Sequence, residues 1–79
     1  MNRPEEHDIL EAFGRNVRES RLKVGLSQEE LAAKAGVHRT YIGMIERGEK
    51  NATIISMHRI SKALGTDLVS LISGVSDGK

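Results

Sequence analysis

The chain has 79 residues, which is enough for one small domain. Its 12 Lys and Arg against 11 Asp and Glu give a net charge of +1, so the sequence as a whole is not strongly basic. The absence of cysteine excludes disulfides and thiolate metal sites, while one Phe, one Tyr and no Trp argue against a protein that stacks single-stranded bases on aromatic rings. The longest uncharged stretch, residues 68–76, has nine residues and is about half of a membrane span, so we expect a cytoplasmic protein.

The first predicted helix covers residues 8–24 and follows a segment, residues 1–7, that we expect to be flexible. Four apolar residues recur at close to the helical period, namely Ile9, Phe13, Val17 and Leu22. Gly25 can adopt the left-handed conformation that ends a helix. Charge is uneven along this part of the chain, because residues 1–12 carry −3 and the remaining residues carry +4.

Two short helices separated by a tight turn are predicted next, over residues 28–35 and about 38–47. Ser27 and Glu30 have the spacing of a capping box, in which each side chain accepts from the backbone N–H of the other residue. Gly36 ends the first of these helices. Since that helix is short and rich in alanine, the pair can cross closely at a steep angle, which is typical of a helix-turn-helix.

A fourth helix is predicted after a polar loop, with Thr53 as its N-cap and Gly65 at its end. Its buried face is expected to consist of Ile54, Met57, Ile60 and Leu64. Asp67 is expected to cap a last short helix that runs to Ile72.

The sequence therefore predicts an all-α chain. We expect one domain over residues 8–73 and a flexible tail over residues 74–79. There is no internal repeat and no strand candidate of more than a few residues.

Many residues of the predicted helix-turn-helix agree in order and spacing with a known family. The relevant runs are Leu26-Ser27-Gln28-Glu29-Glu30-Leu31-Ala32, Ala35-Gly36-Val37 and Ile45-Glu46-Arg47-Gly48. They resemble the Cro/phage-repressor-type (Xre) helix-turn-helix family over residues 13–71. This resemblance implies a five-helix, lambda-repressor-like fold that binds double-stranded DNA.

A narrower resemblance lies in the third helix and in the loop after it. The residues His38-Arg39-Thr40-Tyr41-Ile42, Asn51 and Thr53-Ile54 particularly resemble the controller proteins of restriction–modification systems. Prophage and chromosomal regulators share much of the same stretch, so a repressor of that kind is the alternative within the family.

The third helix is the expected recognition helix, whose first turn would reach base edges in the major groove. We expect Arg39 to bond guanine O6 and N7, and Thr40 to contact a base edge or a thymine methyl group. Gly43 is expected to face the bases, because it has no side chain where the helix approaches DNA. The alternative for Arg39 is a solvated residue or a phosphate contact.

Other polar residues around the recognition helix are expected to bind phosphates, which sets register without reading sequence. These are Gln28, Tyr41, Arg47, Lys50 and Asn51. Gln28 adds its amide to the free N–H groups at a helix start. The resemblance further implies that Arg21 and Glu46 form a partly buried structural ion pair.

Ile55 is out of place for a monomer, because it points about 100° away from the expected core stripe. We expect a twofold dimer built on the last two helices, with Ile55, Arg59, Val69 and Ile72 at its interface. A lone exposed apolar residue is the alternative. Such a dimer would bind a palindromic operator with half-sites one helical turn, roughly 34 Å, apart.

No residue pattern indicates catalysis or a cofactor. His7, His38 and His58 fall on three separate segments without metal-ligand spacing, and no catalytic triad or phosphate-binding glycine loop is present. We therefore expect a regulator that is not an enzyme and needs no metal, cofactor or small-molecule ligand. A rival class is an antitoxin-like protein-interaction module, in which apolar anchors would replace Gln28, Arg39 and Thr40.

Overall fold

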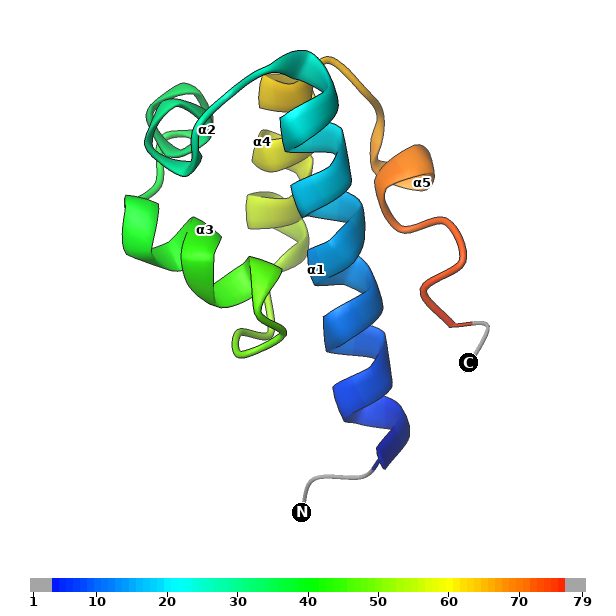
Figure 1. The fold of residues 1–79 in the computed structure, drawn as a ribbon. Helices are drawn as coiled ribbons and strands as arrows, with labels where there is room; N and C mark the ends of the chain where they lie inside the picture. The colour runs from blue at the N-terminus through cyan, green and yellow to red at the C-terminus, as the bar shows by residue number, and fades with distance from the viewer. Residues whose placement is uncertain (1–3, 77–79) are drawn as a thin grey trace.

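The structure of the chain is a computed structural model that describes residues 4–76. Its helices are α1 (Pro4–Val24), α2 (Gln28–Ala35), α3 (Arg39–Glu46), α4 (Ile54–Leu64) and α5 (Leu68–Leu71) (Figure 1). No strand occurs within these described residues. The all-α, five-helix prediction is therefore confirmed for this part of the chain.

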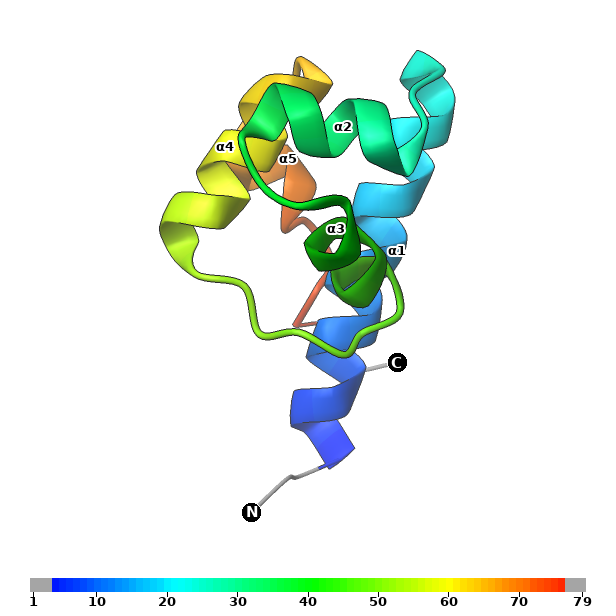
Figure 2. The same ribbon diagram turned by 90° about the vertical axis from the view of Figure 1, so that its left-hand side faces the viewer.

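The helices are arranged around α1, which runs the length of the molecule (Figure 1). α3 and α4 pack against α1, α2 packs on α3 and α4, and α5 lies against α1 and α4. Viewed along α3, α2 crosses above it at a steep angle (Figure 2). α2 and α3 therefore form a helix-turn-helix on the side of the molecule opposite α5 (Figure 1).

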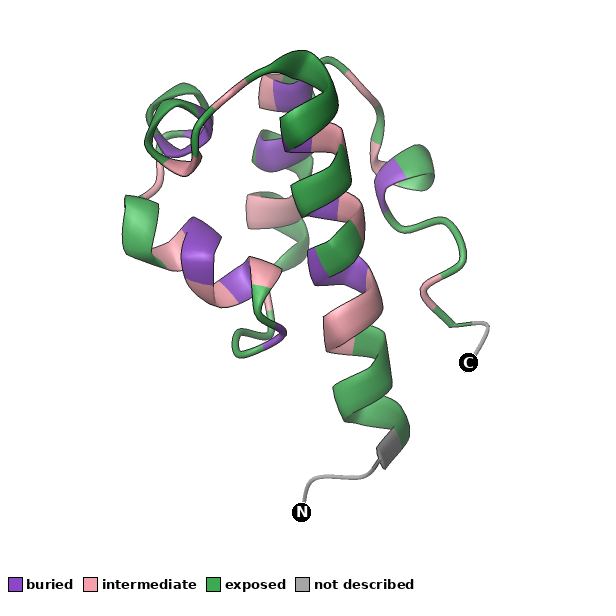
Figure 3. Cartoon of the chain, viewed as in Figure 1, coloured by how far each residue is buried: buried purple, intermediate pink, exposed green. Residues whose placement is uncertain are grey.

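The core lies where the inner faces of the helices meet (Figure 3). Its buried apolar members are Phe13, Val17, Leu31, Ala32, Ala35, Ile42, Ile45, Ile60, Leu64 and Leu71. Every helix contributes at least one of them, which explains how a chain of this size buries a single core without cysteine.

The three predicted N-caps, Ser27, Thr53 and Asp67, are confirmed by capping hydrogen bonds. Ser27 Oγ accepts from the Glu30 N–H at 3.0 Å, and the Glu30 side chain accepts from the Ser27 N–H at 2.8 Å. Thr53 and Asp67 each accept from the N–H three residues further on, at 3.0 and 2.7 Å. These bonds satisfy N–H groups that a helix start leaves without a partner.

The close approach of α1 to α3 depends on Gly14, which is buried in the middle of α1. A Cβ atom there would collide with the backbone oxygen of Ile45 and lie 2.8 Å from that of Glu46. Since these are backbone atoms, no side-chain rotation would relieve the collision. The sequence analysis did not single out this glycine.

Both ends of the predicted domain need revision. α1 begins at Pro4 instead of residue 8, because proline is tolerated at a first helical position and the acidic Glu5 and Glu6 interact favourably with the helix dipole. Residues 74–76 form a turn in which Val75 packs against the core. The rest of the predicted flexible ends, residues 1–3 and 77–79, lies outside the described residues.

Three residues of the predicted apolar stripes are exposed. Ile9 and Leu22 in α1 are 39% and 54% exposed, and Ile54 in α4 is 63% exposed. Arg21 is buried next to Leu22, and Ser61 is buried on the inner face of α4. The buried stripes of α1 and α4 therefore each include a polar residue that a hydrophobic pattern does not reveal.

Candidate nucleic-acid interface

Caps on both sides of the turn fix α3 relative to α2. Gly36 has a φ of 73°, and the Val37 N–H donates to the Ala32 carbonyl at 3.0 Å, which closes α2. His38 precedes α3, and its Nδ1 accepts from the Thr40 N–H at 3.0 Å. The first turn of α3 is therefore held in one orientation at the end that points away from α5 (Figure 1).

The two residues predicted to contact bases lie in this first turn, and both are exposed. The Nη1 atom of Arg39 lies 2.8 Å from Glu29 Oε2 of α2, and these side chains are 66% and 70% exposed. Such an exposed pair contributes at most about 1 kcal/mol. Arg39 therefore has further N–H donors for a base edge, and the pair with Glu29 is weak enough to open.

Gly43 lies in the middle of α3 and is buried. A Cβ atom there would lie 3.2 Å from Arg47 Nη1 and 3.6 Å from Gln28 Oε1. The space beside this glycine therefore holds the ends of two polar side chains of the protein. Contact between Gly43 and the bases stays a prediction.

Gln28 links the start of α2 to the end of α3. Its Nε2 donates to Glu46 Oε1 at 3.0 Å, and the side chain is half-buried. An amide NH₂ has two hydrogens, so one remains for a phosphate. The first backbone N–H groups of α2 lie next to it, and those of Glu30 and Leu31 donate to Ser27.

The other residues predicted to bind phosphates lie in α3 and in the loop after it. Tyr41 is half-buried against the core, and Lys50 Nζ lies 5.8 Å from the centre of its ring. Lys50 and Asn51 are exposed. Arg47 bonds Glu49 through Nε at 3.1 Å, and this hydrogen bond raises the pKa of Arg47.

Arg21 and Glu46 form the ion pair that the family resemblance implies. Arg21 Nε and Nη2 donate to the two Glu46 carboxylate oxygens at 2.6 and 3.0 Å, and Nη1 donates to the Leu26 carbonyl at 3.0 Å. The side chains are 8% and 3% exposed. The hydrogen bond to Glu46 raises the pKa of Arg21, so the guanidinium stays charged.

The residues predicted for a dimer interface lie on the outer surfaces of α4 and α5. Ile55 is 60% exposed, Val69 76% and Ile72 41%, and Arg59 is exposed as well. Ile54 adds a fifth exposed side chain, which the sequence analysis placed in the core. The apolar surface at these two helices is therefore larger than predicted.

Asn16 positions the end of α5, and the sequence analysis missed it. Its Nδ2 atom in α1 donates to the carbonyls of Leu71 and Ser73 at 2.7 and 3.0 Å. The only signal in the sequence was an asparagine between the apolar positions of the first helix. Asn16 thereby ties the C-terminal segment that carries Val69 and Ile72 to α1.

Metal clusters and membrane-spanning helices are not found in residues 4–76. Within that range, no group of three His, Cys, Asp or Glu residues could hold a metal ion. Over the same residues, no helix has both the length and the apolar character needed to cross a membrane.

Comparison with known proteins agrees with this geometry. A helix-turn-helix family, HTH_3, matches residues 17–71. Control protein C.SmaI of Serratia marcescens is 46% identical over 66 residues, which cover 84% of this chain and 79% of that protein. Control protein C.BamHI of Bacillus amyloliquefaciens is 45% identical over 73 residues, or 91% and 90% of the two chains.

A solved structure has the same fold. The restriction-modification controller protein C.AhdI from Aeromonas hydrophila is 39% identical and superposes with a TM-score of 0.77 over 78% of this chain and 94% of that one. The family match covers more than half of the sequence, and the relatives are transcription regulators. The chain therefore belongs to the Cro/phage-repressor-type (Xre) helix-turn-helix family of transcription regulators.

Proposed function

We propose that this protein is the controller of a restriction–modification system and acts as a homodimer on a palindromic operator in double-stranded DNA. The observation that carries the proposal is the exposed first turn of α3, with Arg39 and Thr40 at its surface. C.SmaI and C.BamHI match most of this chain, and both are named control proteins. These names support the assignment as a controller. A chromosomal repressor is the alternative, because uncharacterised regulators match as well, one of them at 35% identity.

In this proposal, Arg39 leaves Glu29 and donates two parallel bonds to a guanine in the major groove, while Thr40 contacts the neighbouring base pair. The remaining amide hydrogen of Gln28 and the α2 N-terminus bind a phosphate on one side. Lys50 and Asn51, with Arg47 and the Tyr41 hydroxyl, bind phosphates on the other side, where they set register.

Dimerisation supplies the second recognition helix. Ile55, Val69 and Ile72 expose apolar surface on α4 and α5, and a twofold axis through this surface would bury it in both copies. Protein concentration would then control occupancy of the operator through the monomer–dimer equilibrium. We propose this equilibrium as the regulatory switch, in which a first bound dimer activates and a second represses.

The test of base reading is selection of binding sites from a random DNA duplex pool at stated salt, with the wild type and Arg39→Ala. The wild type should enrich a palindrome, and Arg39→Ala should lose about 1–3 kcal/mol on that site, mainly at one base pair per half-site. The control Lys50→Ala should weaken binding to all sequences alike. Equal losses on operator and scrambled DNA for Arg39→Ala would refute the base contact, and no enrichment would favour a protein-interaction module.

The test of the dimer is sedimentation of Ile55→Glu. We expect a monomer at concentrations where the wild type is a dimer, because a carboxylate would be desolvated in the interface. Leu22→Glu is the matched control, since Leu22 is a similarly exposed apolar residue but belongs to α1 and not to α4 or α5. A dimer that survives Ile55→Glu would place the interface elsewhere.

A further inference from the structure

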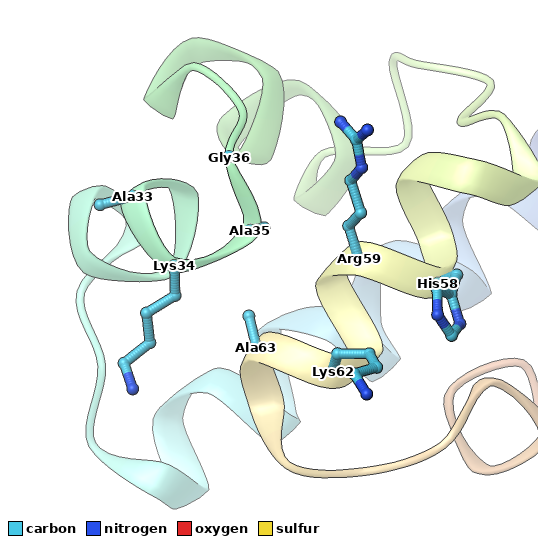
Figure 4. Close-up of a pocket in the computed structure, with 8 residues that line it drawn as sticks. All are labelled: Ala33, Lys34, Ala35, Gly36, His58, Arg59, Lys62 and Ala63. Atoms are coloured by element: carbon cyan, nitrogen blue, oxygen red, sulfur yellow. The ribbon is translucent and has the colours of Figure 1, made fainter.

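A basic groove lies between α2 and α4, and of the residues proposed to contact DNA or a dimer partner it contains only Arg59. It has a volume of about 660 Å³ and is lined by Ala33, Lys34, Ala35, Gly36, His58, Arg59, Lys62 and Ala63. Lys34 extends from α2, while His58, Arg59 and Lys62 extend from α4, with small residues between the two helices (Figure 4). The groove is therefore bordered by long cationic side chains over a floor of small residues.

The charge of this groove is unbalanced. Its lining contains two lysines, an arginine and a histidine but no acidic residue. All four side chains are exposed, and none of them pairs with a carboxylate among residues 4–76. A surface of this kind attracts carboxylates or phosphates.

The position of the groove argues against DNA as its ligand. It lies at the C-terminal half of α2, whereas the phosphate site proposed at Gln28 is at the N-terminus of the same eight-residue helix, about 10 Å away. The other proposed phosphate contacts are in α3 and in the loop after it. No groove residue belongs to the N-terminus of α2, to α3 or to that loop.

A complementary acidic surface lies at the start of α1. Glu5, Glu6 and Asp8 are exposed and have no cationic partner among the described residues. The first turns of α1 extend beyond the other helices and are exposed on all sides (Figure 3). Because α1 is one continuous helix whose later turns pack on α3 and α4, its first turn cannot fold back into the groove of the same copy.

We propose that the acidic first turn of α1 of one copy docks in the basic groove of a second copy. This contact joins two different surfaces, so it is heterologous, and it shares only Arg59 with the residues proposed for the twofold interface at α4 and α5. It would link dimers to one another. Since both surfaces are exposed and charged, the contact is expected to be weak and to depend strongly on salt.

The test is sedimentation at about 0.01 M salt, where the Debye length is ~30 Å, and at about 1 M, where it is ~3 Å. The wild type should form species larger than a dimer only at low salt. The groove variant Lys34→Glu/Lys62→Glu should lose at least tenfold in this association, and so should the helix variant Glu5→Lys/Glu6→Lys. A wild type that stays dimeric at low salt would overturn the proposal and leave the groove to another acidic partner.

The decisive measurement uses a fourfold variant, which carries the groove substitutions Lys34→Glu/Lys62→Glu and the helix substitutions Glu5→Lys/Glu6→Lys in one chain. This fourfold variant has the net charge of the wild type, and opposite charges again face each other, so association should return. A matched control combines Glu5→Lys/Glu6→Lys with Arg18→Glu/Lys23→Glu, two exposed cations of α1 outside the groove. It has the same net charge, but its groove and its first turn are both basic, so it should not associate.

Two further outcomes would overturn the proposal. The first is recovery of association in the control as well as in the fourfold variant, because net charge alone would then explain the effect. The second is a groove variant that loses operator affinity more than Arg18→Glu/Lys23→Glu does, which would make the groove a phosphate site for DNA.

Lys34→Gln/Lys62→Gln, with folding checked by circular dichroism, repeats the test without introducing new carboxylates.

Discussion

Glu46→Gln should be among the most destabilising single substitutions in this chain. Glu46 accepts three hydrogen bonds, two from Arg21 and one from Gln28, and its side chain is only 3% exposed. The variant keeps one acceptor oxygen but removes the charge and turns an NH₂ group toward the Arg21 donors. Because the ordinary pKa of arginine is far above 7, Arg21 stays charged without Glu46, and a buried cation would be left without a counter-charge at a cost of about 3–5 kcal/mol.

The assay is urea unfolding at pH 7 and fixed protein concentration, because dimerisation would couple stability to concentration. Glu29→Gln is the matched control, since Glu29 bonds Arg39 at 2.8 Å but both side chains are mostly exposed. That substitution should cost at most about 1 kcal/mol. If Glu46→Gln costs no more than Glu29→Gln, burial does not set the strength of this pair and the reasoning is wrong.

A double substitution separates the loss of the pair from the cost of a lone charge. Arg21→Met/Glu46→Leu removes both charges at similar volume, and we expect it to regain much of what Glu46→Gln loses. A double variant as unstable as the sum of its single substitutions would mean that the two residues act independently.

Two further predictions concern backbone packing and acid stability. Gly14→Ala should lower the free energy of unfolding by about 1–3 kcal/mol or more, because its Cβ would collide with backbone oxygens at the end of α3. Urea unfolding measures this loss. An unchanged urea midpoint would show that α1 and α3 can separate freely. The hydrogen bond from the Ser70 N–H lowers the pKa of Asp67 in the folded state. The ionised Asp67 therefore stabilises the fold at a pH above its unfolded pKa. This contribution is lost as the pH falls through the lower pKa of the folded state. Asp67→Ala should therefore lose less stability than the wild type below about pH 4. The measurement is the urea midpoint as a function of pH. If the midpoint of the variant falls as steeply with acid as that of the wild type, Asp67 does not contribute to acid unfolding.

The exposed Leu22 shows why part of the core could not be predicted from periodicity. The pattern of Ile9, Phe13 and Val17 continues to Arg21 at a spacing of four residues, but a charged residue is not expected inside. Arg21 is buried because Glu46, 25 residues away, neutralises it. Hydrophobic periodicity cannot contain that information, whereas the family resemblance identified the pair.

The same holds for α4, with a smaller side chain. Ser61 is buried, and its hydroxyl donates to the His58 carbonyl at 2.7 Å, so the polar group is satisfied within the helix. Ile54 at the first position is left exposed. Caps, turns and helix order were predictable because they depend on neighbours in sequence, while the partners of Arg39 and Gln28 depend on how α2 and α3 cross.

The two ends of α3 differ in a way that suits recognition. Its last turn is fixed to α1 by the Gly14 approach and by Glu46, which also bonds Gln28 of α2. Its first turn is exposed, and only the weak pair with Glu29 holds Arg39. If Arg39 contacts a base as proposed, the backbone that presents it is already ordered, so the conformational cost of that proposed contact is confined to one side chain and one exposed ion pair.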